Sequence, residues 1–251
     1  MSARTTTEWL GAFDGRTGQH GGIRAVGLAA TEPGLRAVLG PSLATFQLGE
    51  SGTGEHLFAA ARKARADDGY LGALARFVAE EQEHARLLEL VLIELDVPLR
   101  IHHWTDRVFV LVRRAHSLRS EILVLMVAEV IALSYYSALR DGIGDPALAD
   151  AFGRIHDDEV VHVEFHCQTL PPHLDRFPPP VRAVAGWAWN LLVVGASVVV
   201  AVDHGRLLGR VELSRRQFMA QVWRDRQRVS ARLFPRRRGP SRTSGGRRAR
   251  R

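Results

Sequence analysis

The protein has 251 residues with a formal net charge of +7, and 46% of them are hydrophobic and 24% charged. This balance is ordinary for a globular protein and excludes wholesale disorder. The single cysteine, Cys167, excludes a disulfide framework and every multi-cysteine zinc or iron–sulfur site, which favours a reducing compartment. The opening sequence MSARTTTEWLGAFDG lacks the apolar core of a secretory signal. We therefore expect a cytoplasmic protein.

The positive charge is concentrated at the C-terminus. Residues 236–251 contain eight arginines and no acidic residue, so the preceding chain carries a charge of −1. The Gly, Pro and Ser content of this stretch predicts a solvated, disordered, Arg-rich tail over residues 235–251. Attraction to phosphate leaves contact with nucleic acid or anionic lipid as an alternative. Nucleic acid is the less favoured partner, because no aromatic residues are interleaved with the arginines.

The first 42 residues are predicted to form an irregular N-terminal extension. From residue 43 onward apolar residues recur with helical spacing, and no segment shows the alternation of a strand. Asp67 can cap the second helix and Pro98 follows its end, while Pro146 suits the first turn of the fourth helix. The fold class is therefore all-α, with a four-helix bundle over residues 43–170 built from helices near 43–66, 69–95, 106–140 and 146–170.

Residues 171–234 are predicted to add two C-terminal helices, near 181–209 and 214–233. Ala183–Val202 is a run of 20 residues without a charge, which is long enough to cross a membrane. Asn190 and Ser197 lie within the run and suit a helix packed against the bundle. We therefore expect a buried fifth helix, and membrane insertion or attachment through residues 183–202 is the alternative.

Two Glu-x-x-His pairs carry the chemistry, Glu81 with His84 and Glu159 with His162. Residues three apart lie on one face of a helix, so each pair can hold one metal ion. Both pairs lie on apolar stripes, with Phe77 near the first pair. A carboxylate and an imidazole buried on such a face must be paired or bound to metal.

Each pair follows a glutamate on an apolar stripe. Glu50 precedes Glu81 by 31 residues, and Glu129 precedes Glu159 by 30. Antiparallel helices with turns near the midpoints bring all six side chains to one level of the bundle. Four carboxylates and two imidazoles are the ligand set used for two iron or manganese ions.

Two nearby glutamates need assignment. We prefer Glu50 to Glu55 because Glu55 shares its helix face with Arg62 and Lys63, which indicates a solvated face. Glu121 lies eight residues before Glu129 on nearly the same face, and we favour a surface residue, with a channel or rim residue as the alternative.

The order Glu … Glu-x-x-His … Glu … Glu-x-x-His resembles the ferritin-like di-iron carboxylate superfamily over residues 43–170. The segments AEVIALSYY and IHDDEVVHVEFH resemble its third and fourth helices. The resemblance implies two Fe ions, or one Mn and one Fe, with Glu81 and Glu159 as bridges. It also implies that Asp158 orients the histidine of the opposite pair, and Glu80 stands at the matching position before Glu81. A homodimer is the default assembly for such a protein.

Our first functional hypothesis is an oxidase or oxygenase that activates dioxygen and oxidises a small organic or lipid-like substrate. It needs an external electron donor, and its catalytic residues are the metal ligands alone. An iron-handling protein with ferroxidase activity is the second hypothesis. A non-enzymatic helical scaffold stabilised by metal is the third.

Overall fold

The computed structural model describes residues 3–16, 32–101 and 117–235, and these ranges contain helices and no strand. The helices are α1 (Thr6–Asp14), α2 (Pro33–Glu50), α3 (Glu55–Lys63), α4 (Asp68–Glu94), α6 (Leu118–Gly142), α7 (Pro146–Thr169), α8 (Pro171–Leu174), α9 (Pro179–Asp203), α10 (Gly205–Arg210) and α11 (Arg215–Leu233). The predicted Arg-rich tail lies mostly outside the described residues.

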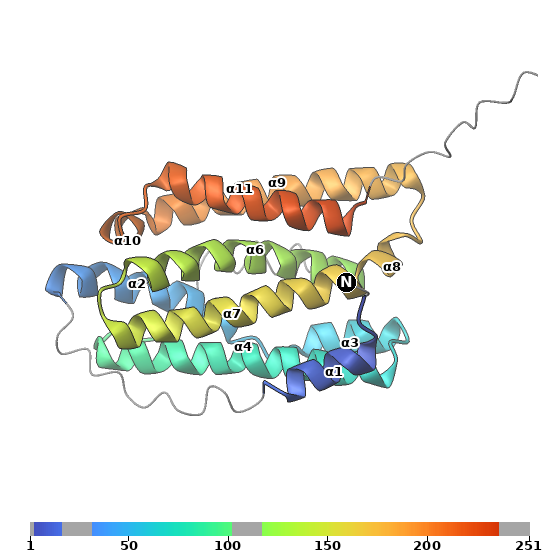
Figure 1. Ribbon diagram of the computed structural model, residues 1–251, viewed down its shortest axis with the longest axis horizontal. Helices are drawn as coiled ribbons and strands as arrows, with labels where there is room; N and C mark the ends of the chain where they lie inside the picture. Colours follow the sequence, from blue (N-terminus) through green and yellow to red (C-terminus); the bar gives the residue numbers. More distant parts are fainter. Residues whose placement is uncertain (1–2, 17–31, 102–116, 236–251) are drawn as a thin grey trace, which may run out of the picture.

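Helices α2, α4, α6 and α7 form the bundle, and α1 and α3 pack against it (Figure 1). Local signals set the helix starts as predicted. The Asp67 side chain accepts a hydrogen bond from the Tyr70 amide at the start of α4, and Asp145 caps α7 just before Pro146. A short turn then reverses the chain between α6 and α7, so the two helices run antiparallel along each other.

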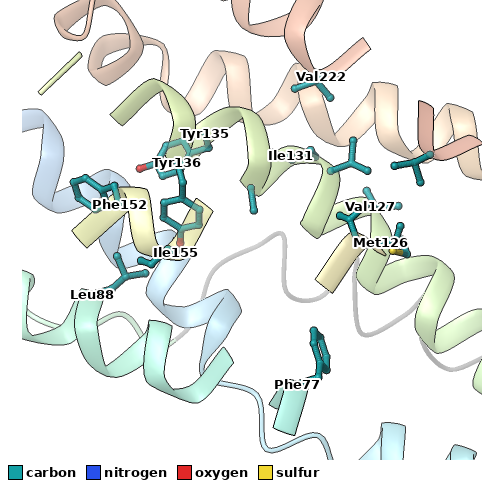
Figure 2. Packing of buried hydrophobic residues seen from close by; sticks show 14 of the residues in the cluster. Phe77, Leu88, Met126, Val127, Ile131, Tyr135, Tyr136, Phe152, Ile155 and Val222 are labelled. Carbon is teal, nitrogen blue, oxygen red and sulfur yellow. The ribbon is translucent and has the colours of Figure 1, made fainter. Parts of the chain in front are cut away.

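The hydrophobic core is continuous across these helices. Figure 2 shows Phe77 of α4, Tyr136 of α6 and Phe152 of α7 among its members. Val222 of α11 lies on the other side of α6 and is also buried. Helix α6 therefore packs on the bundle with one face and on the C-terminal helices with the other, which explains its nearly uninterrupted apolar sequence.

The expectation of an irregular chain up to residue 42 is wrong for the described part of that segment. Thr5 and Glu8 form a capping box that starts α1, and Trp9 and Phe13 are fully buried against the bundle. Helix α2 starts at Pro33, ten residues earlier than expected, and continues through Pro41. A nine-residue helix and a helix with an internal proline both lack the long regular pattern on which sequence prediction depends.

Two predicted helices are each interrupted. The helix expected over 43–66 breaks between Glu50 and Glu55, where Gly54 has φ of 71°, a left-handed conformation that favours glycine. The helix expected over 181–209 ends at Asp203 and is followed by α10. The third helix is described from Leu118, and its predicted start at 106 lies outside the described residues.

Helices α9 and α11 form a second layer over α6, on the side of the bundle away from α4 (Figure 1). The indole Nε1 of Trp189 in α9 donates a hydrogen bond of 2.9 Å to the Leu123 carbonyl in α6. By length and composition α6 and α9 could both cross a membrane, but α6 is mostly buried within the protein. Helix α9 is mostly exposed, so the expectation of a buried fifth helix holds for its inner face alone.

Candidate metal centre

The structure brings the six predicted side chains together in the middle of the bundle. Glu50 is the last residue of α2, Glu81 and His84 lie on α4, Glu129 lies on α6, and α7 supplies Glu159 and His162. Their ligand atoms form two groups in which all atoms lie within 4.8 Å of one another. The first group is Glu50, Glu81, His84 and Glu159, and the second is Glu81, Glu129, Glu159 and His162. Glu81 and Glu159 belong to both groups.

Burial distinguishes the site from ordinary charged surface. Glu50, Glu129 and Glu159 are buried and Glu81 is nearly so, whereas Glu55 is exposed. The choice of Glu50 over Glu55 therefore agrees with the geometry. The interpretation of Glu121 as a surface residue is wrong, because its side chain is buried near the start of α6.

The two histidines are held symmetrically from outside the cluster. His84 Nε2 lies 3.0 Å from Asp158 Oδ2, and His162 Nε2 lies 2.9 Å from Glu80 Oε2. Each acceptor comes from the opposite Glu-x-x-His helix, as the resemblance implies for Asp158. Because a carboxylate at Nε2 favours the tautomer with its proton there, Nδ1 of each ring keeps a lone pair for a metal ion.

The Nδ1 atoms of both histidines face the carboxylates. His84 Nδ1 lies 3.5 Å from Glu159 Oε1, and His162 Nδ1 lies 2.9 Å from Glu81 Oε1. Two phenylalanines pack on the His162 ring. Phe77 contacts it edge-on at 4.7 Å between ring centroids, and Phe13 makes a tilted contact with it. The cluster is therefore a polar pocket with an aromatic wall.

Sequence reasoning missed Arg16, which follows α1. Its Nη2 contacts Asp158 Oδ1 and its Nε lies 3.6 Å from Glu80 Oε1. One guanidinium thus joins the two carboxylates that hold the two histidines. No local signal could have found Arg16, because it is 142 residues from Asp158 in the sequence.

Tyr136, which the sequence favours as a packing residue with a hydrogen bond near the metals as the alternative, does contact the site. Its hydroxyl donates a hydrogen bond of 2.9 Å to Glu50 Oε1, and its ring is fully buried between bundle helices. Its neighbour Tyr135 instead contacts Ser42, whose Oγ also lies 2.6 Å from His204 Nδ1. The seven-residue spacing from Glu129 to Tyr136, two helical turns on one face, is the signal that could have indicated this contact.

The electrostatics of the cluster reflect four carboxylates crowded in a buried space. Burial and the neighbouring glutamates raise the pKa of Glu50 and of Glu129 well above the ordinary value. Burial lowers the pKa of His84 to about 4, so this imidazole is neutral at neutral pH. Burial also opposes the charged form of His162, but the four carboxylates around the ring favour that form and raise its pKa well above the usual value. The site attracts positive charge.

The residues present fit two metal ions. Among the described residues, Glu81 Oε1, Glu129 Oε2 and His162 Nδ1 are buried without a hydrogen-bond partner. Buried polar atoms are normally satisfied, and all three point into the cluster. Two divalent cations would satisfy them and balance four carboxylates, while carboxylate and imidazole donors suit iron and manganese. The fold and the site together define a ferritin-like helical bundle with a carboxylate–histidine cluster able to bind two metal ions.

Comparison with known proteins agrees with this description of the fold. No protein-family model matches the sequence, and no curated protein sequence matches it. Among solved structures, the chain is similar to a mutant of an R2-like ligand-binding oxidase with an aerobically reconstituted Mn/Fe cofactor. The TM-score is 0.71 at 14% sequence identity, and the match covers 92% of this chain and 93% of that chain. The chain therefore has an R2-like, ferritin-like fold over nearly its whole length.

Proposed function

We propose that this protein is a two-metal oxidase that activates dioxygen and oxidises a small organic or lipid-like molecule. The observation that carries the proposal is the pair of ligand groups that share Glu81 and Glu159. Two groups with two carboxylates in common suit two adjacent ions better than two separate sites. The structural neighbour is described as an oxidase with a Mn/Fe cofactor, which supports a pair of Fe ions or one Mn and one Fe.

Each ligand has a distinct place in this proposal. Glu81 and Glu159, common to both groups, would be shared by the two ions, while Glu50 and His84 would hold one ion and Glu129 and His162 the other. When bound, the two ions supply the capacity to exchange two electrons with dioxygen at one site.

The remaining residues prepare the ligands for that chemistry. Asp158 and Glu80 orient the histidine rings and, through Nε2, make them better donors. Tyr136 holds one oxygen of Glu50 in place. Phe13 and Phe77 cover His162 and limit the access of water to it. An external donor supplies electrons for repeated turnover, because one cysteine cannot build an iron–sulfur centre.

Metal content and an optical spectrum test the proposal. We expect protein reconstituted with Fe²⁺, or with Mn²⁺ and Fe²⁺, to hold close to two ions per chain and to develop oxo-bridge absorption in air. Glu81→Ala removes a ligand common to both groups and should abolish binding of the pair. Glu83→Ala is the matched control, because Glu83 lies on the same helix but pairs with Arg86 at the surface.

The outcomes separate the hypotheses. Retention of two ions by Glu81→Ala, or no metal in the wild-type protein, would overturn the ligand assignment. Loading far beyond two ions per chain in a shell-sized assembly would favour iron handling. Bound metal that never changes oxidation state in air would favour a scaffold.

A further inference from the structure

Helix α9 presents a long apolar face to the outside of the molecule. Exposed large side chains recur along it every three or four residues, which places them on one stripe. This outer face of α9 consists of Val181, Val184, Trp187, Leu191, Leu192, Val198 and Val202. No charged residue interrupts the helix from Ala183 to Val202. Soluble monomers rarely expose an apolar stripe of this length, so it indicates an interaction surface.

The opposite side of α9 is held by the protein itself. Trp189 donates to the Leu123 carbonyl of α6, and the Asn190 side-chain amide donates to Ser230 Oγ of α11 at 3.1 Å. Ser197 Oγ donates to the Val193 carbonyl within the helix. The Asn190 and Ser197 side chains in the charge-free run thus both have hydrogen-bond partners within the protein. The outer face can enter an apolar environment while α9 stays in place on the bundle.

Charge is distributed unevenly relative to this face. Residues 204–251 contain 16 arginines and two acidic residues, a formal charge of +14, so the rest of the chain carries −7. The positive segment begins where α9 ends and includes α11, which lies beside α9 (Figure 1). Trp223 of α11 is half exposed and carries the Arg226 guanidinium 3.8 Å above its ring, and Arg226 also contacts Asn190 of α9. Cationic side chains of α11 therefore lie beside α9.

We propose that the outer face of α9 docks this protein onto an anionic lipid membrane, with the helix lying in the plane of the interface. An apolar helix face buried at the headgroup boundary and adjacent arginines attracted to anionic lipid are the two components of such binding. Indole rings such as those of Trp187 and Trp223 suit that boundary, where one edge is apolar and the other wet.

A second copy of the chain fits the same face less well. Symmetric pairing of two α9 helices brings two copies of α11, each with a formal charge of +5, toward each other, which opposes association. Full insertion of α9 requires the loss of its contacts with α6 and α11. Docking in the plane of the membrane uses the exposed face and the positive charge together and leaves the packing unchanged.

Co-sedimentation of the full chain with lipid vesicles tests this proposal. We expect binding to vesicles of phosphatidylcholine and phosphatidylglycerol at low salt, and little binding to phosphatidylcholine alone. The double variant Trp187→Glu/Leu191→Glu should lower the partition coefficient about tenfold or more, because it places two charges on the face that enters lipid. Exchange of the eight arginines in residues 236–251 for glutamine should weaken binding and reduce its dependence on salt.

Ile93→Glu is the matched control. Ile93 of α4 is 64% exposed, close to the 67% of Trp187, and α4 lies on the side of the bundle away from α9 (Figure 1). This variant should bind vesicles like the wild type, and circular dichroism should show the same helix content for all variants. The proposal would be overturned if Ile93→Glu and the double variant lost vesicle binding equally, or if the wild type did not bind anionic vesicles. A wild-type dimer in light scattering that the double variant converts to a monomer without any lipid effect would also overturn it.

Discussion

At the scale of single residues, the metal centre depends on a cation that the ligand motifs do not include. Arg16 contacts Asp158 and Glu80, and these two carboxylates orient His84 and His162. A carboxylate contacted by a guanidinium is fixed in position to accept the Nε2 proton of its histidine. Arg16 therefore acts on both metal positions through other side chains.

We expect Arg16→Ala to weaken metal binding about 10–100-fold, the usual effect of removing an outer partner of a ligating histidine. Titration of the metal-free protein with Mn²⁺ in competition with a chelator measures this affinity. Arg76→Ala is the control. Arg76 of α4 pairs with Asp14 of α1 at 2.6 Å, so this substitution removes an exposed ion pair between the same two helices without touching the site. Equal weakening in both variants would mean that Arg16 acts only by attaching α1.

Cys167 should be chemically inert in the folded protein. Burial raises the pKa of its thiol to about 12, so at pH 8 only ~1 in 10⁴ molecules carries the reactive thiolate. We expect iodoacetamide to modify Cys167 slowly in the native protein and rapidly in urea. The native rate should continue to rise with pH above 9, where an exposed thiol has already levelled off. Rapid native labelling at pH 8 would contradict this account of the thiol.

At the scale of elements, the break between α2 and α3 sets the position of Glu50. Glu50 ends α2, and the chain turns through Ser51–Gly54 before α3 begins. Gly54 is essential to the turn, because its φ of 71° is left-handed and a Cβ there would lie 2.8 Å from Val78 Cγ2. The same glycine therefore permits both the break between the two helices and close packing on α4.

Gly54→Ala should destabilise the protein by about 1–3 kcal/mol, from backbone strain together with the clash against Val78. It should also weaken metal binding, because Glu50 directly precedes this turn and its position depends on the turn. Gly52→Ala tests the same loop without either effect, since a Cβ at residue 52 meets nothing within 4 Å. Urea denaturation of both variants gives the comparison. Equal stability of the two would show that the loop adapts without strain.

At the scale of the whole molecule, the centre joins all the bundle helices through groups that repel one another. Glu50, Glu81, Glu129 and Glu159 come from α2, α4, α6 and α7, and their negative charges are buried together. Without cations this repulsion opposes the packing of the helices. Metal ions that bind only the folded state should therefore stabilise the bundle as a unit.

We expect metal-loaded protein to be more stable than chelator-treated protein by about 2.7 kcal/mol when free metal is about 100 times its Kd. Calorimetry in the presence and absence of Fe²⁺ or Mn²⁺ measures the shift in Tm. Glu81→Gln should show no gain in Tm from metal, because it alters a carboxylate common to both ligand groups. A gain from metal equal to that of the wild type would place the ions elsewhere.

Much of the bundle could be read from the order of residues. The limits of α4 and α7 follow from Asp67, Asp145 and Pro146, which act within one turn of helix. The six clustered side chains follow from a spacing of three on one helix and from matched hairpin lengths between helices. These signals are local or periodic, so they survive without knowledge of the packing.

Other features depend on partners that only folding brings near. Helix α1 is stabilised because Trp9 and Phe13 are buried against the bundle. Its C-terminal end then places Arg16 in contact with Asp158 and Glu80. The apolar run of α9 is the same in sequence whether it is buried, exposed or in lipid. The sequence by itself determined the all-α fold and the six clustered ligand candidates, since helix geometry links spacing to position. Tertiary structure decided which cation supports them and which face of α9 stays open, because contacts between distant segments leave no pattern in the chain.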